Sequence, residues 1–115
     1  MDRPFVPVTT AEALESLFSQ SAEHPVIVFK HDTSCPISKA AYSQLQGVTQ
    51  DVAVVDVARS QALSEEIAAR TGVKHESPQV IVVQDGQAVW SASHYDITEA
   101  AVTQVGLQSC ERGGG

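Results

Sequence analysis

The sequence predicts a layered α/β fold, and three observations carry this prediction. Short runs rich in β-branched residues occur at 26–29, 52–57 and 79–83. Helical patterns of apolar residues precede, separate and follow the first two of these runs. A strong two-residue turn, Asp85-Gly86, follows the third run. Strands that are separated by helices must run parallel, so the sheet is expected to pack between layers of helices.

The first helix is expected to follow an extended lead-in over residues 1–8, where two prolines prevent an earlier start. Thr9 and Glu12 have the spacing of a capping box, which predicts that the helix begins there. The step His24-Pro25 ends its apolar pattern.

The positions of the second and third helices are predicted from the residues that begin and end them. The second helix follows the strand at 26–29, begins at a Cys-Pro step and closes near Gly47. The third helix covers 60–70 after the strand at 52–57, and Gly72 is its expected stop.

The second half of the chain is expected to read strand, strand, helix. The run at 79–83 and its partner at 87–91 form a hairpin around the two-residue turn. Asp96 and Glu99 have capping spacing and are expected to open the last helix. The predicted order is therefore α-β-α-β-α-β-β-α, with a four-stranded mixed sheet that is flanked by helices.

Composition indicates a single domain over residues 1–112 and a flexible glycine tail over 113–115. Seven basic and fourteen acidic residues give a net charge of −7, which argues against nucleic acid and anionic membranes as partners. No signal segment and no apolar run that could span a bilayer are apparent. The two cysteines, Cys35 and Cys110, are too few for a disulfide scaffold and fit a reducing cytosol, so a cytoplasmic location is expected.

Cys35 is the candidate catalytic residue, because it stands where a buried strand meets a helix. Pro36 suits the first helical position, since its missing N–H has no helical partner. The sulfur of Cys35 is then expected near the N-cap, where it accepts from the N–H of Ile37 or Ser38 at the positive end of the helix dipole. Nearby basic residues add positive charge: Lys30, His31 and Lys39. This environment favours a thiolate, and the alternative is that Cys35 is only a buried small residue.

The residue three positions after Cys35 is Ser38 rather than a second cysteine. A C-x-x-C pair closes an intramolecular disulfide, whereas C-x-x-S must take its second thiol from elsewhere. The pattern therefore predicts monothiol chemistry, with the Ser38 hydroxyl one helical turn from the sulfur. Cys110 lies past the last helix and is expected to be a bystander, with a resolving role as the alternative.

The order of elements, with a cysteine at the start of the helix after the first strand, resembles the thioredoxin fold over nearly the whole chain. A second mark is Ser77-Pro78 immediately before the third strand, where thioredoxin-like proteins carry a cis proline that faces the active cysteine. The resemblance implies that Pro78 is cis and that the backbone of Ser77 is free to pair with a bound thiol substrate. The alternative is an ordinary trans proline at a strand entrance.

Three separated segments carry a more specific resemblance. They are Phe29-Lys30-His31-Asp32-Thr33-Ser34-Cys35-Pro36-Ile37-Ser38, His75-Glu76-Ser77-Pro78-Gln79, and Trp90-Ser91-Ala92-Ser93-His94-Tyr95-Asp96-Ile97-Thr98. Together they are similar to the YtxJ family of bacillithiol-system proteins, the monothiol bacilliredoxins, which have a T-C-P-I-S-like motif. Ser34 stands at the first position of that motif and keeps the hydroxyl group.

This resemblance implies the reduction of mixed disulfides between proteins and bacillithiol, a thiol built from cysteine, glucosamine and malate. The Cys35 thiolate attacks the bacillithiol sulfur and carries bacillithiol until a second thiol or a partner reductase removes it. Bacillithiol is then a co-substrate, and no tightly bound cofactor or metal is expected. The implied partners are bacillithiolated client proteins, a low-molecular-weight thiol and, as a candidate, a flavin-dependent reductase.

The implied site has a catalytic group and a substrate-binding group. The catalytic group is Cys35, Pro36 and Ser38, and the substrate-binding group is Ser34, Ser77, Pro78, Ser93 and His94. Ser77 and Pro78 are expected to hold the peptide-like part of the thiol. A helix start near Asp96 to Thr98 is expected to offer N–H groups to the malate carboxylates, with Ser93 and His94 as helpers.

Two functions of other classes stay open. One is an iron–sulfur carrier on a glutaredoxin-like scaffold, although Pro36 departs from the C-G-F-S pattern of such carriers and no Gly-Gly pair precedes the last helix. The other is a binding module that kept the fold and lost the chemistry, which a Cys35 resistant to alkylation would indicate. No pair of residues with the spacing of zinc ligands supports a metal site.

Overall fold

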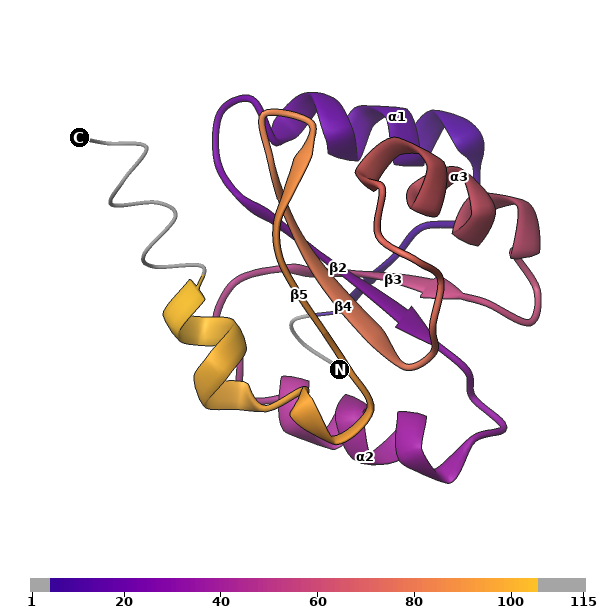
Figure 1. Ribbon diagram of the computed structural model, residues 1–115, viewed down its shortest axis with the longest axis vertical. Helices are drawn as coiled ribbons and strands as arrows, with labels where there is room; N and C mark the ends of the chain where they lie inside the picture. The colour runs from indigo at the N-terminus through magenta and orange to yellow at the C-terminus, as the bar shows by residue number, and fades with distance from the viewer. Residues whose placement is uncertain (1–4, 106–115) are drawn as a thin grey trace.

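The computed structural model describes residues 5–105, which form a five-stranded sheet with helices on both faces (Figure 1). The elements are β1 (Phe5–Pro7), α1 (Ala11–Gln20), β2 (Val26–His31), α2 (Pro36–Leu45), β3 (Val52–Asp56), α3 (Gln61–Thr71), β4 (Gln79–Gln84), β5 (Gln87–Ser93), the short 3-10 helix η1 (His94–Asp96) and a final helix described over 99–105. None of the helices in this described part has the length and apolar character needed to cross a membrane.

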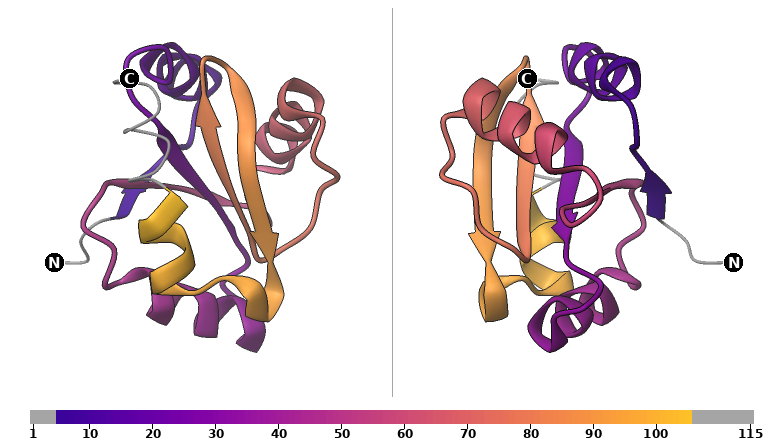
Figure 2. Two further views of the ribbon diagram at one scale, coloured as in Figure 1. Left: turned by 60° about the vertical axis from the view of Figure 1, so that its left-hand side comes forward. Right: turned by 90° about the vertical axis from the view of Figure 1, so that its right-hand side faces the viewer.

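The sheet has the strand order β1-β3-β2-β4-β5, which places β2 at its centre. β1, β3 and β2 run parallel, because a helix separates each from the next along the chain. β4 and β5 run antiparallel as a hairpin, and β4 also pairs antiparallel with β2. Helices α1 and α3 cover one face, while α2 and the final helix cover the other (Figure 2).

The central strand β2 is buried at all six positions and divides the core into two halves. Because side chains alternate along a strand, Val28 packs toward α1 and α3, and Phe29 packs toward α2. Helix α1 contributes Leu14 and Phe18 to the first half, and α2 contributes Ala41 and Leu45 to the second. The end of β2 is therefore held between two packed layers, directly before Cys35.

The prediction of a four-stranded sheet is wrong, because residues 5–7 form the additional edge strand β1 rather than an unpaired lead-in. Phe5 pairs with Val52, and the Val8 N–H donates to the Val54 carbonyl at 2.9 Å. Pro7 is tolerated because β1 has a neighbour on one side only. The element order begins with this strand and includes η1 before the last helix, so the predicted order α-β-α-β-α-β-β-α is also incomplete.

Two predicted helix starts are displaced by a few residues. Thr10 rather than Thr9 caps α1, since its hydroxyl accepts from the Ala13 N–H at 3.0 Å. The final helix begins at Glu99 after Thr98, whose hydroxyl accepts from the Ala101 N–H at 3.2 Å. The residues before it form η1, so Asp96 does not open this helix.

The predicted turns are confirmed by the backbone conformation. Gly72 ends α3 with a φ of 73°, a left-handed conformation that glycine adopts without strain. Asp85 and Gly86 have φ values of 54° and 75°, as the tight turn between β4 and β5 requires.

Candidate functional site

Cys35 lies at the N-cap of α2 and is partly exposed. Its extended backbone (φ −102°, ψ 124°) ends the loop after β2, and Pro36 occupies the first helical turn as predicted. The expected hydrogen bond from the N–H of Ile37 or Ser38 to the sulfur is absent, because the Cys35 side chain makes no capping bond. The sulfur therefore lies at the positive end of the helix without a local donor holding it.

Asp32 organises the turn that precedes Cys35. Its Oδ1 accepts from the Ser34 hydroxyl at 2.7 Å and from the Ser34 N–H at 3.0 Å. Its carbonyl accepts from the Cys35 N–H at 3.0 Å. The hydrogen bonds from Ser34 lower the pKa of the Asp32 carboxyl, so this carboxylate stays ionised as the turn cap. The Ser34 hydroxyl proton is thus used inside the turn, although the residue itself is exposed.

Ser38 is fully buried, and its hydroxyl is directed toward the end of β2. Its Oγ lies 2.7 Å from His31 Nδ1 and accepts from the Asp32 N–H at 2.9 Å. The prediction that this hydroxyl is offered to the Cys35 sulfur therefore has to be corrected, since its contacts tie α2 to β2. The sequence considered His31 only as nearby positive charge. A histidine that closes a run of buried strand residues was the available signal.

Ser77-Pro78 is a cis peptide, which confirms the prediction from the thioredoxin-like pattern. Gln79 pairs with Lys30 across β2 and β4, so Pro78 lies at the end of β2 from which the loop to Cys35 departs. No hydrogen bond to the backbone of Ser77 is found among residues 5–105. The main chain next to Pro78 is thus free to pair with a bound chain.

Ser93 and His94, two members of the expected substrate-binding group, lie next to Pro78. The His94 N–H donates to the Pro78 carbonyl at 3.1 Å, and His94 has a left-handed φ of 55°. Its imidazole lies 3.7 Å from the Glu76 carboxylate. The η1 turn that follows packs against α2.

The substrate subsite that was expected at a helix start near Asp96 to Thr98 stays a prediction, and the helix itself begins directly after Thr98. The final helix starts at Glu99, whose N–H donates to Gln44 Oε1 at 3.1 Å. That donor is already used within the protein, so it does not stand free for a carboxylate.

Lys30, which the sequence considered only as nearby positive charge, is a buried cation. Its side chain is fully buried, on the face of the sheet opposite His31 because neighbours on a strand alternate. In the described part of the chain its Nζ has one polar partner, His75 Nδ1 at 3.3 Å. Burial lowers the pKa of Lys30, and loss of hydration together with the Lys30 charge lowers the pKa of His75. This contact ties the end of β2 to the loop that leads into Pro78.

Replacing Lys30 with methionine is expected to stabilise the protein by about 1–3 kcal/mol at pH 7, because a buried charge gives way to an apolar chain of similar length. The folded-state pKa of Lys30 lies below its ordinary value of 10.5, so the unfolded chain binds more protons between these two values. Stability of the native chain should therefore rise with pH through that window, and Lys30→Met should lose this rise. Urea unfolding at pH 7 and at alkaline pH measures both effects.

The matched control is Lys39→Met, since Lys39 is exposed on α2 and its replacement should change stability by less than about 0.5 kcal/mol. A Lys30→Met variant that is less stable than the native chain at pH 7 would contradict the prediction.

Two sequence predictions fall on residues that the structure does not describe. Cys110 and the glycine tail over 113–115 lie outside the described residues. Within residues 5–105, no three His, Cys, Asp or Glu side chains gather in a way that could hold a metal ion.

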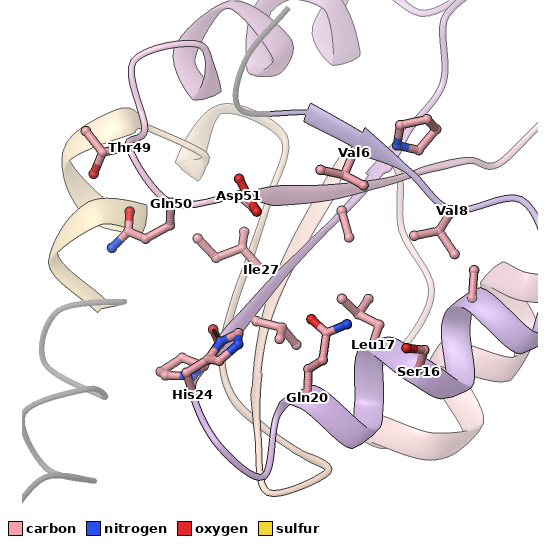
Figure 3. Close-up of a pocket in the computed structure, with 15 residues that line it drawn as sticks. Val6, Val8, Ser16, Leu17, Gln20, His24, Ile27, Thr49, Gln50 and Asp51 are labelled. Atoms are coloured by element: carbon pink, nitrogen blue, oxygen red, sulfur yellow. Dashed lines mark hydrogen bonds between the residues drawn. The ribbon is translucent and has the colours of Figure 1, made fainter.

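A cavity of about 810 Å³ opens at the opposite end of the sheet (Figure 3). It is lined by Val6 of β1 and Val8 just after it, by Leu17 of α1 and by Ile27 near the start of β2. Cys35 follows the other end of β2, roughly 17 Å away along the strand at 3.3 Å per residue. The cavity is therefore separate from the thiol site.

Comparison with solved structures agrees with this fold. A protein solved as a proposed oxidoreductase with a thioredoxin fold is 32% identical, with a TM-score of 0.80 over 87% of this chain and 91% of that chain. Thioredoxins from Schistosoma mansoni (18% identity, TM-score 0.70, 90% and 94% covered) and Fasciola hepatica (20%, 0.67, 90% and 97%) share the fold. The chain is thus an oxidoreductase of the thioredoxin-like superfamily. Within it, the chain belongs to the monothiol bacilliredoxin BrxC family, whose model matches residues 6–102.

Proposed function

We propose that this protein is a monothiol thiol-disulfide oxidoreductase that removes bacillithiol from protein mixed disulfides. The observation that carries the proposal is a partly exposed Cys35 at the N-cap of α2, in a chain of the monothiol bacilliredoxin family. The N-terminus of α2 is the positive end of the helix dipole, and the exposure of Cys35 gives a substrate disulfide access to the sulfur.

The first step transfers bacillithiol from the client protein to Cys35. The Cys35 thiolate attacks the bacillithiol sulfur of the mixed disulfide, and a new disulfide joins Cys35 to bacillithiol. The bond between bacillithiol and the client breaks, and the client thiolate leaves and takes a proton from water. Client and enzyme thus exchange oxidation states, so this step needs no external oxidant or reductant.

The backbone near Pro78 is suited to hold the substrate during this exchange. The free main chain of Ser77 can pair with the cysteine-derived amide of the thiol in the manner of an added strand. Ser93 and His94 border the same place through the hydrogen bond of His94 to the Pro78 carbonyl. Ser34 is exposed in the turn immediately before Cys35.

The second step regenerates Cys35 with a thiol from outside the site. Residue 38 is serine, so no neighbouring thiol can displace bacillithiol within the motif. A second bacillithiol molecule attacks the disulfide on Cys35, and bacillithiol disulfide leaves. Bacillithiol is therefore a co-substrate rather than a bound cofactor, and a flavin-dependent reductase is the kind of partner that returns the disulfide to the thiol.

Intact mass spectrometry after incubation with bacillithiol disulfide, in parallel with glutathione disulfide, tests this function. The native chain and Cys110→Ala should each gain one bacillithiol adduct, and Cys35→Ala should gain none. The native chain should also take bacillithiol from a bacillithiolated client protein. Adduct formation should be faster with bacillithiol disulfide than with glutathione disulfide.

Equal rates with the two disulfides would overturn the choice of bacillithiol while leaving thiol exchange intact. The absence of an adduct from both disulfides, with a Cys35 that also resists alkylation, would overturn thiol exchange and favour a binding module. A visible absorbance band of an iron–sulfur cluster on the purified protein would favour the carrier function instead.

A further inference from the structure

The segment 72–78, which we call the proline loop, joins α3 to the start of β4 without forming a helix or a strand (Figure 1). Two side chains of the sheet hold it. The Lys30 Nζ lies 3.3 Å from His75 Nδ1, and the Gln79 Nε2 donates to the Lys74 carbonyl at 2.9 Å. Lys30 and Gln79 are partners in the register of β2 and β4, so both contacts come from one cross-strand pair.

The contact between Lys30 and His75 requires a neutral imidazole. Lysine has the higher ordinary pKa, 10.5 against 6.5, so the ammonium is the donor at neutral pH. An ammonium group has no lone pair, so His75 Nδ1 must accept, which it can do only while it carries no proton. Lys30 is fully buried, and His75 is its one hydrogen-bond partner within residues 5–105. A proton on Nδ1 would therefore bring two cations together and leave a buried ammonium without an acceptor.

We propose that Lys30 is a positioning residue that holds the proline loop against the sheet through neutral His75, and that the loop is released when His75 takes up a proton. The proton comes from water, and no covalent bond of the chain changes. The loop ends in Ser77 and Pro78, so the main chain suited to substrate pairing is released with it. This consequence for the substrate rests on the proposed function, whereas the release of the loop does not.

The charges around His75 set the direction of this response. They belong to Lys30 of β2, Glu65 of α3, Lys74 and Glu76 of the loop, and His94 of η1, which faces Glu76. Loss of hydration and the Lys30 charge lower the pKa of His75, and they outweigh the two carboxylates, which raise it. The stability that the contact contributes is therefore complete above pH 6.5 and is lost as the pH falls through the lowered pKa of His75. Release of the loop is expected in acid.

Amide relaxation and imidazole titration by NMR test the proposal without any bacillithiol. In the native chain, the amides of 73–77 should be rigid above the midpoint of the His75 titration and mobile below it. His75→Gln keeps an acceptor for the Lys30 ammonium but cannot take up a proton, so its loop should stay rigid at both pH values. Lys30→Met should raise the His75 midpoint and abolish the dependence of loop mobility on pH. The matched control, His24→Gln, changes an exposed histidine at the far end of β2 and should behave as the native chain does.

A loop that is equally rigid above and below the His75 midpoint would overturn the proposal. A His75→Gln loop that becomes mobile in acid as the native loop does would also overturn it, because that variant has no proton to gain at this position. An unchanged His75 midpoint in Lys30→Met would show that the Lys30 charge does not act on the imidazole, and would overturn it as well.

Uptake of bacillithiol from bacillithiol disulfide measures the consequence for the substrate. One pH unit below the His75 midpoint, about nine-tenths of the chains carry the proton, so uptake by the native chain should be about tenfold slower than uptake by His75→Gln. Well above the midpoint the two rates should agree. If the loop is released in acid but Cys35 gains no adduct, the proposed function fails and the role of Lys30 stands. If adducts form at equal rates in acid and the loop stays rigid, the role of Lys30 fails and the proposed function stands.

Discussion

Replacing Cys35 with serine is expected to reduce the rate of bacillithiol removal from a client protein by at least about 10³-fold. The physical reason is that thiol-disulfide exchange needs a thiolate as nucleophile, and a serine hydroxyl neither ionises near neutral pH nor forms a disulfide. The measurement is the rate at which the bacillithiol mass is lost from a purified client in the presence of excess thiol. Because Cys35 is partly exposed and makes no capping bond, its replacement should leave thermal unfolding nearly unchanged.

The control for this prediction is Cys110→Ser, which changes the other cysteine of the chain. A purely monothiol mechanism predicts native rates for this variant. If Cys110→Ser stopped turnover after a single adduct had formed on Cys35, Cys110 would be a resolving thiol and the monothiol scheme would be wrong. If Cys35→Ser kept the native rate, Cys35 would not be the exchanging residue.

Local sequence patterns predict most of the fold, because turn residues, helix stops and strand patterns each act over only a few neighbouring residues. The hairpin turn at Asp85 and Gly86 and the helix stop at Gly72 depend on backbone conformations that few residues adopt, and both are confirmed. The edge strand at residues 5–7 could not be found in this way. It has three residues, ends in a proline, and is defined by its pairing with β3 at residues 52–54, far along the chain, which no local pattern encodes.

Local patterns also fail to give the exact first residue of two helices. Thr9 and Thr10 are chemically identical capping residues, and only the packing of α1 against the sheet decides which one takes the cap. Likewise, the insertion of η1 after β5 moves the start of the final helix to Glu99.

The residues of the candidate site also fall into two groups: those that local sequence patterns mark, and those that only tertiary contacts bring together. Cys35 was singled out because it stands at a boundary between a strand and a helix that the sequence itself marks, and the cis form of Pro78 was expected from the resemblance to thioredoxin-like proteins. The bond between His31 and Ser38 was missed, because it exists only after α2 folds back onto the end of β2. The contact of Lys30 with His75 spans 45 positions and needs β2 and β4 to be neighbours. Sequence patterns thus point to the candidate cysteine, while tertiary packing determines which polar groups lie in the neighbouring elements.

Replacing Phe29 with alanine is expected to lower the free energy of unfolding by about 3–5 kcal/mol. Phe29 is fully buried on the central strand, where its ring lies 6.4 Å from Phe5 and 5.0 Å from His31. Removing the ring takes apolar surface out of the core and leaves a cavity that the rigid sheet cannot close completely. Urea unfolding followed through the fluorescence of Trp90, the one tryptophan of the chain, measures the change.

Tyr95→Ala is the matched control, since this aromatic side chain is 73% exposed and its loss should cost less than about 0.5 kcal/mol. Phe29→Leu, which keeps most of the volume, should fall between the two and provides a variant that folds if Phe29→Ala does not. A Phe29→Ala variant as stable as the native chain would contradict the packing of this face, and with it the physical basis for the position of His31.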